Sequence, residues 1–143
     1  MDGNQFADEL LKVAAELHKI SEVPRKTVQI AAPKIADLVA QEFQQGASPT
    51  GATWAPLKTG GQSTLTKSGR MRSKVKVVAD GTLVRGTLPA PANIHQYGST
   101  KRNIQARPMV LRGSTLPATW EKALDESVTE ALATLAPELQ GSK

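Results

Sequence analysis

Apolar and polar residues near the start of the chain alternate with the period of a helix. One apolar set falls at positions i, i+4, i+7, i+8 and i+11, and so shares a helix face: Phe6, Leu10, Val13, Ala14 and Leu17. A second stripe follows it: Val28, Ala31, Ile35, Leu38, Val39 and Phe43. Ser21 and Pro24 separate the two patterns, and Gly46 is a typical helix stop. Residues 1–45 therefore predict two helices. Either Pro33 kinks the second helix, or that helix begins only near Ala31.

Residues 46–67 interrupt this periodicity with a stretch rich in Gly, Pro, Ser and Thr. A loop of this length is unusual in a compact domain, and such loops are typically functional or become ordered when a partner binds. Trp54 lies in the middle of the loop. Two interpretations stay open: Trp54 pins the loop onto its own domain, or it contacts a neighbouring molecule.

The period changes to two in the centre of the chain. An alternating segment predicts a strand with one set of residues on one face: Ser73, Val75, Val77 and Ala79. Lys74 and Lys76 then share the opposite face of that strand. Asp80-Gly81 is a strong hairpin signal, and residues 82–88 predict the second strand.

The remaining segments predict a turn, an extended stretch and a last helix. Residues 92–98 read as a short helical turn closed by Gly98, and residues 99–105 as a polar, basic loop. Pro108 favours an extended start to residues 106–112. Within 113–143, Ser114 or Thr115 is expected to cap a helix with this apolar stripe: Trp120, Leu124, Val128, Ala131, Leu132 and Leu135. The 143 residues are expected to form a single domain, with 68–112 holding the hairpin, the turn and the extended segment.

Positive charge is concentrated in the middle of the chain. Residues 57–112 carry eleven basic residues and one acidic residue, whereas 1–56 and 113–143 have balances of −2 and −3, giving +5 overall. A positive region attracts nucleic-acid phosphate or an acidic protein surface. The simpler interpretation is that these side chains solvate the outer face of a sheet.

Composition excludes several classes of protein. The chain has no cysteine, which rules out disulfides, zinc–thiolate sites and a thiol nucleophile. Two histidines, His18 and His95, do not make a typical zinc site, so no metal and no cofactor are predicted. No apolar run approaches the roughly 20 residues of a membrane span, and the acidic start does not resemble a signal peptide. With only five aromatic residues the core is thin, and partner subunits are expected to add stability.

The sequence does not favour catalysis. It contains no P-loop, GxGxxG, HExxH or GxSxG motif, and its carboxylates lie away from both histidines along the chain. Ser99 and His95 are one nucleophile–base pair that folding could assemble, but no spacing supports it. The chain is therefore predicted to be a binding module or a structural component and not an enzyme.

Three patches, in order over about residues 43–110, match a known protein family. The first runs from Phe43 through PTGATWAPL, the second is LTKSGRMRSKVKV, and the third is ANIHQYGSTKRNIQARPMV. Together they resemble the tail-completion (virion morphogenesis, neck) proteins of tailed bacteriophages. The chain departs from the usual family pattern at MRS, at Gln105, and at Pro89 and Pro91, which leaves the subfamily open.

The resemblance implies a structural virion protein without catalytic residues. Such proteins form rings, commonly six-fold, that join the head connector to the tail around the DNA path. The implied fold is α+β: N-terminal helices and a C-terminal helix packed on a small antiparallel β-sheet, with a long protruding loop. The order read from the pattern (helix, helix, loop, hairpin, turn, strand, helix) agrees with this fold.

The same resemblance implies the partners and the location. The partners are further copies of the chain, the neighbouring connector or stopper, and tail terminator or tail tube proteins. DNA passes through the lumen without sequence readout, and no membrane is involved. The protein is then expected in the virion neck or tail, after assembly in the host cytoplasm.

A closed ring requires head-to-tail contacts between copies. The residues predicted to lie at subunit or neighbouring-ring interfaces are Trp54, Lys58, His95, Gln96, Tyr97, Arg102 and Arg107. His95 and Gln96 alternatively serve only to build the turn, and Arg107 pairs either with a carboxylate of a neighbouring ring or with an acid on its own terminal helix. Residues 46–67 are expected to order on assembly, and removal of 48–62 to block assembly while the remaining domain folds.

Three cations are predicted to face the DNA channel: Lys74, Lys76 and Arg85. Two other functions stay open. One is a different connector ring, either a tail terminator or a head–tail adaptor. The other is a small basic DNA-binding protein, which a steep salt dependence of DNA affinity would favour.

Overall fold

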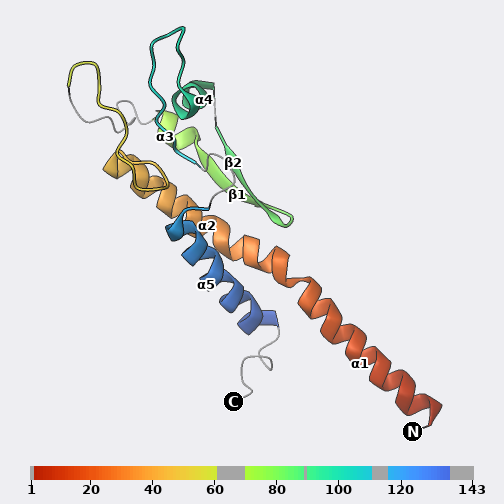
Figure 1. Ribbon diagram of the computed structural model, residues 1–143. Helices are drawn as coiled ribbons and strands as arrows, with labels where there is room; N and C mark the ends of the chain where they lie inside the picture. Colours follow the sequence, from red (N-terminus) through yellow and green to blue (C-terminus); the bar gives the residue numbers. More distant parts are fainter. Residues whose placement is uncertain (1, 61–69, 89, 111–115, 136–143) are drawn as a thin grey trace.

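The computed structural model describes residues 2–60, 70–88, 90–110 and 116–135 (Figure 1). Its elements in chain order are α1 (Gly3–Ser21), α2 (Val23–Gln45), α3 (Arg70–Lys74), β1 (Lys76–Asp80), β2 (Leu83–Thr87), α4 (Ala90–Tyr97) and α5 (Ala118–Leu135). Helices combined with a two-stranded antiparallel sheet make the fold α+β, as predicted. The predicted cap at Ser114 or Thr115 and part of the predicted loop lie outside the described residues.

The first two helices follow one another along nearly one line (Figure 1). Asp2 and Gln5 form a capping box that begins α1. Only Glu22 separates the helices, and its N–H donates to the carbonyls of His18 and Lys19, so the helical bonding is barely interrupted. The alternative that the second helix begins near Ala31 is wrong, because α2 starts at Val23 and contains Pro33.

Helix α2 ends where the sequence predicts. Gly46 has φ 65°, a left-handed conformation that glycine adopts without the steric cost of a Cβ atom, and its N–H donates to the carbonyl of Glu42. The chain therefore leaves the helix sharply and turns back over its last turn.

Helix α5 packs against α2 through small residues. Its buried side chains are Trp120, Ala123, Ser127 and Ala131. The predicted stripe is confirmed at Trp120 and Ala131, and Leu124 packs against the core, but Val128 is exposed. Small side chains let the two helices approach closely, and the Ser127 hydroxyl is satisfied by donating to the carbonyl of Ala123 at 2.6 Å.

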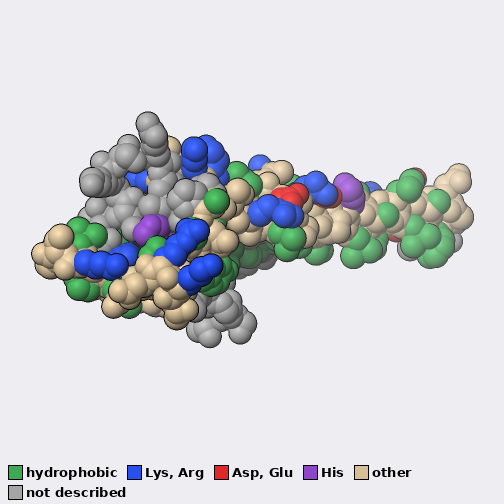
Figure 2. All heavy atoms as spheres, turned by 90° about the horizontal axis from the view of Figure 1, so that it is seen from above, with side chains coloured by type: hydrophobic (Ala, Val, Ile, Leu, Met, Phe, Trp, Pro, Cys, Tyr) green, Lys and Arg blue, Asp and Glu red, His purple; other side chains and the backbone are tan. Residues whose placement is uncertain are grey.

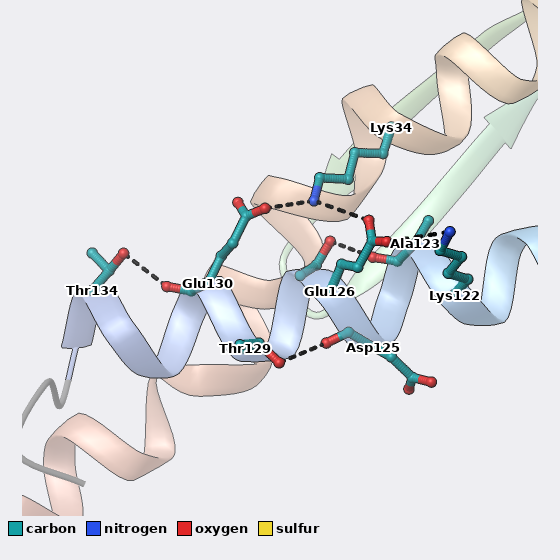
Figure 3. A network of polar contacts seen from close by, with 9 residues as sticks. Lys34, Lys122, Ala123, Asp125, Glu126, Thr129, Glu130 and Thr134 are labelled. Atoms are coloured by element: carbon teal, nitrogen blue, oxygen red, sulfur yellow. Dashed lines mark hydrogen bonds and ion pairs between the residues drawn. The ribbon is translucent and has the colours of Figure 1, made fainter. Parts of the chain in front are cut away.

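Ion pairs join the same two helices at the surface (Figure 3). Lys34 of α2 reaches Glu130 at 2.6 Å and Glu126 at 3.9 Å on α5. Exposed ion pairs of this kind contribute about 0–1 kcal/mol each, so the pair of helices is stabilised mainly by its buried contacts.

The hairpin covers another side of α2. The register pairs Val77 with Gly86 and Ala79 with Val84, and Val77 and Val84 pack against the core. Gly81, with φ 62°, forms the predicted turn. The predicted strand start is wrong: residues Arg70–Lys74 are helical, so Lys74 does not share a strand face with Lys76. An alternating pattern over a few residues does not reveal that the first of them form a helical turn and that the strand begins only after it.

The core lies where α2, α5, the hairpin and the segment around Met109 meet. Its largest members are Ile35, Phe43, Trp54, Met109 and Trp120. Of the five aromatic residues, Phe43, Trp54 and Trp120 lie in this core, whereas Phe6 and Tyr97 are exposed. Helix α1 contributes no buried residue. The predicted packing of the N-terminal helices on the sheet therefore applies to α2, while α1 projects beyond it (Figure 1).

Candidate interaction site

The first residues of the loop after α2 fold back onto the core, and the loop does not protrude from its start. The Trp54 N–H donates to the carbonyl of Gly46 at 2.7 Å, and the Ser48 N–H donates to that of Ala52 at 2.8 Å. Ala47, Ser48 and Trp54 are buried as a result, whereas residues 57–60 are exposed. A chain lacking residues 48–62 would lose Trp54 from the core, which argues against the expectation that it still folds. That expectation stays a prediction.

Trp54 is fixed by two contacts from distant parts of the chain. Its ring meets Phe43 edge to face with centroids 5.5 Å apart, and its Nε1–H donates to the carbonyl of Pro108 at 2.7 Å. Only 3% of the residue is exposed. This geometry favours the interpretation that Trp54 pins the loop onto its own domain, and its predicted place at a subunit interface stays a prediction.

Gln96 takes the place of a strand partner for the segment after Pro108. Its Oε1 accepts from the N–H groups of Met109 at 2.7 Å and Val110 at 3.2 Å, and its Nε2 donates to the carbonyl of Val110 at 3.1 Å. Gln96 is fully buried on α4. An amide side chain supplies both a donor and an acceptor, so one glutamine satisfies backbone groups that a neighbouring strand would otherwise have to satisfy. The described part of the segment predicted to be extended, residues 106–110, belongs to no regular strand.

Arg107 joins the loop to the same segment. Its Nε and Nη2 donate to the carbonyls of Ala55 and Pro56, each at 2.9 Å, and its backbone N–H donates to the carbonyl of His95 at 2.6 Å. Arg107 is buried, and its described partners are carbonyl oxygens. The predicted pairing of Arg107 with an acid of the terminal helix is therefore wrong, while a contact with a neighbouring ring stays a prediction.

A cavity of about 400 Å³ brings three predicted site residues together, and its walls include Lys58, His95 and Arg107. Burial, and then the nearby charge of Arg107, lower the pKa of His95, so its imidazole is neutral at pH 7. Its Nδ1 is buried and has no hydrogen-bond partner among the described residues. Within the described ranges no group of three or more His, Cys, Asp or Glu side chains could hold a metal.

The other predicted residues lie elsewhere. Tyr97 is 60% exposed and belongs to the wall of a different, apolar cavity. Arg102 is exposed in the loop that the backbone bridge between Ser99 and Ile104 closes. The structure thus divides most of the predicted residues into two groups. Trp54, Gln96 and Arg107 form a buried unit, whereas Lys58, Tyr97 and Arg102 are exposed around it.

The cations predicted to face DNA are spread over two elements. By the hairpin register, Lys76 and Arg85 share the face turned away from the core, and Lys74 ends α3. Arg85 forms an ion pair with Asp80. Lys76 and Arg85 are both exposed, and Asp80 partly offsets the charge of Arg85.

Gly98 closes the turn between the buried unit and the exposed loop. Its φ is 74°, and a Cβ atom there would lie 2.9 Å from both the Ala106 nitrogen and the Ile104 oxygen. We expect Gly98→Ala to lower the free energy of unfolding by about 3 kcal/mol, through the unfavourable φ and the backbone clash together. Urea denaturation followed by circular dichroism measures the change.

Gly51→Ala is the matched control for that substitution. Gly51 also has a positive φ, 88°, but a Cβ atom there meets nothing within 4 Å. This variant should lose only about 1 kcal/mol, the cost of the backbone conformation alone. Equal losses in the two variants would show that the close approach to residues 104–106 contributes nothing.

Sequence reasoning missed Glu42, which lies buried near the end of α2. Burial raises the pKa of this carboxyl to about 8, and the nearby Trp120 indole offsets part of the effect. The contact with Trp120 is not a well-formed hydrogen bond, since the Glu42 Oε2 and the Trp120 Nε1 are both buried without a partner in the described structure. The sequence does indicate that Glu42 is buried, because this residue interrupts the apolar stripe of the helix beside Phe43.

Comparison with known families matches the phage virion morphogenesis family over residues 2–119. The match spans most of the chain and includes all three sequence patches, the buried unit and the hairpin. The chain therefore belongs to the phage virion morphogenesis family, and its role lies in building the phage particle. Comparison with curated proteins and with solved structures gives no significant match. Among the described helices, none has both the length and the apolar character of a membrane span.

Proposed function

We propose that this chain is a neck or tail-completion protein that forms a ring, six-fold in symmetry, between the head connector and the tail. The role is structural and needs no catalytic residue. In this proposal the ring surrounds the DNA channel and contacts the connector or stopper on one side and tail terminator or tail tube proteins on the other.

One observation carries the proposal. The first and third family patches converge on a single buried unit, in which Trp54, Gln96 and Arg107 bind backbone groups more than ten residues away. This unit holds exposed polar and aromatic groups in fixed positions around it, among them Lys58, Tyr97 and Arg102. A rigid subunit that presents such groups suits repeated contacts between identical copies.

The charge distribution supports a place beside DNA. The hairpin presents Lys76 on its outer face, with Lys74 on the preceding helical turn. Because Arg85 is paired with Asp80, this face is only moderately basic. Moderate attraction to phosphate lets DNA pass, whereas a densely basic lumen would retain it.

The test is the position and copy number of the chain in intact particles. We expect cryo-electron microscopy and quantitative mass spectrometry of purified virions to find it at the head–tail junction in several copies, six for the proposed ring. Particles made without it should accumulate as filled heads and separate tails. A chain that is absent from mature virions, or that lies in the capsid shell or the distal tail, would overturn the proposal.

A further inference from the structure

Helix α1 carries an apolar stripe that no other described segment of the chain covers. Its members are each between 50% and 60% exposed: Phe6, Leu10, Val13, Leu17 and Ile20. No residue of α1 is buried, and hydrophobic side chains line one edge of the projecting helix in Figure 2. The intervals of four, three, four and three residues form the seam of a helix that packs lengthwise against a partner.

The body of the same chain has an apolar groove. It has a volume of about 440 Å³ and lies between the hairpin, α2 and α5. Its walls include Val77, Val84, Tyr97 and Leu124, and Gly86 leaves part of the hairpin surface without a side chain. The groove and the stripe are both surfaces that water contacts unfavourably.

Helix α1 does not reach the groove of its own chain. It continues the line of α2 away from the hairpin (Figure 1). Folding it back would break the hydrogen bonds at the junction, where Glu22 donates to His18 and Lys19 and accepts from Lys26. Within the described residues, therefore, α1 leaves both its own stripe and the groove uncovered.

We infer that α1 of one copy lies in the groove of the next copy. Residues 1–21 carry four acidic and two basic residues, whereas residues 57–112, which include the hairpin, carry eleven basic and one acidic. The helix and the body of a second copy therefore attract one another. Helix-in-groove recognition of this kind uses anchors at the spacing seen in α1.

The area is sufficient for a specific contact. Half-exposed large apolar side chains offer roughly 100 Å² each, so five offer roughly 500 Å² and the two surfaces together roughly 1,000 Å². This reaches the lower limit of specific protein interfaces, roughly 1,000 Å². Pairing of α1 with a second α1 would cover the stripe but leave the groove open, whereas one head-to-tail contact covers both.

A head-to-tail contact leaves a free helix at one end and a free groove at the other until the ring closes. The inference thus gives the proposed ring its subunit contact, and it rests on that proposal only for closure. The contact itself is tested in the isolated full-length protein. Contact between copies without a place at the head–tail junction would refute the ring role and leave the contact established.

Cysteine cross-linking tests the contact, since the natural chain has no cysteine. One preparation carries Leu17→Cys and the other Tyr97→Cys, and a short bis-maleimide joins residues that approach one another. We expect the mixture to give at least tenfold more cross-linked dimer than either variant alone, and the double variant to give a ladder of oligomers. A Leu17→Cys variant that cross-links to itself as efficiently would show that α1 pairs with α1 and would overturn the inference.

Charge substitutions on α1 give an independent measurement. Leu10→Glu combined with Leu17→Glu should weaken self-association roughly 100-fold in analytical ultracentrifugation, with an unchanged circular dichroism spectrum because both residues are exposed. Leu11→Glu is the matched control: Leu11 is 69% exposed but lies off the stripe, so self-association should persist. A wild-type protein that stays monomeric at high concentration, or equal effects of the stripe and control substitutions, would overturn the inference.

Discussion

Trp54→Ala is expected to lower the free energy of unfolding by about 4 kcal/mol. The substitution removes a side chain that is almost fully buried, its edge-to-face contact with Phe43, and the hydrogen bond to the carbonyl of Pro108. A single domain typically has only about 5–15 kcal/mol of stability, so the variant should be close to unfolding at 37 °C. Urea denaturation followed by far-ultraviolet circular dichroism measures the loss.

Two further variants separate the contributions to this effect. Trp54→Phe keeps an aromatic ring but removes the N–H donor, and should cost about 1–2 kcal/mol because a carbonyl loses its partner. Leu57→Ala, in the exposed part of the same loop, should change stability by less than about 0.5 kcal/mol. A Trp54→Ala midpoint equal to that of Leu57→Ala would contradict the place of Trp54 in the core.

The stability of the wild-type protein is expected to fall as the pH rises from 4.5 to 8, because of Glu42. Its pKa is about 8 in the folded chain and 4.5 as a free side chain, so the folded state binds the proton more tightly. This contribution is fully present below pH 4.5 and is lost as the pH rises through 8. Across this window the loss is on the order of 4 kcal/mol.

Glu42→Gln should remove this dependence, since the amide resembles the protonated carboxyl and does not ionise. At pH 8.5 the variant should be more stable than the wild type, while Glu121→Gln, an exposed control on α5, should follow the wild-type curve. The lowered pKa of His95 acts in the opposite direction, with stability lost as the pH falls below 6.5, and it is present in all three proteins. Identical pH profiles for wild type and Glu42→Gln would contradict the burial of this carboxyl.

The helices and the hairpin turn follow from local chemistry. Asp2 and Gln5 supply a cap, Gly46 and Gly81 adopt positive φ, and the spacing of apolar residues marks each helix. Local reasoning failed at α3, where a few alternating residues imitated a strand. It also misjudged part of α5, where Ala123 and Ser127 are buried and Val128 is exposed.

The candidate site was predictable as a set of residues but not as an arrangement. The motif identified Trp54, Gln96 and Arg107, yet it did not show that their polar atoms bind the chain's own backbone. Their partners lie 13 to 54 residues away. Hydrogen bonds over such separations depend on how the whole chain is folded, and a pattern of neighbouring residues does not predict them.

By itself, the sequence determined the amphipathic helices, the hairpin turn, the basic middle and the phage family of this protein, because each depends on residue type and short spacing. Only the tertiary structure decided which apolar stripe has a partner. The stripes of α1 and α2 look alike along the chain, yet α2 is enclosed by α5 and the hairpin while α1 extends past both. Burial is a property of what surrounds a surface, and the described part of the chain does not surround α1.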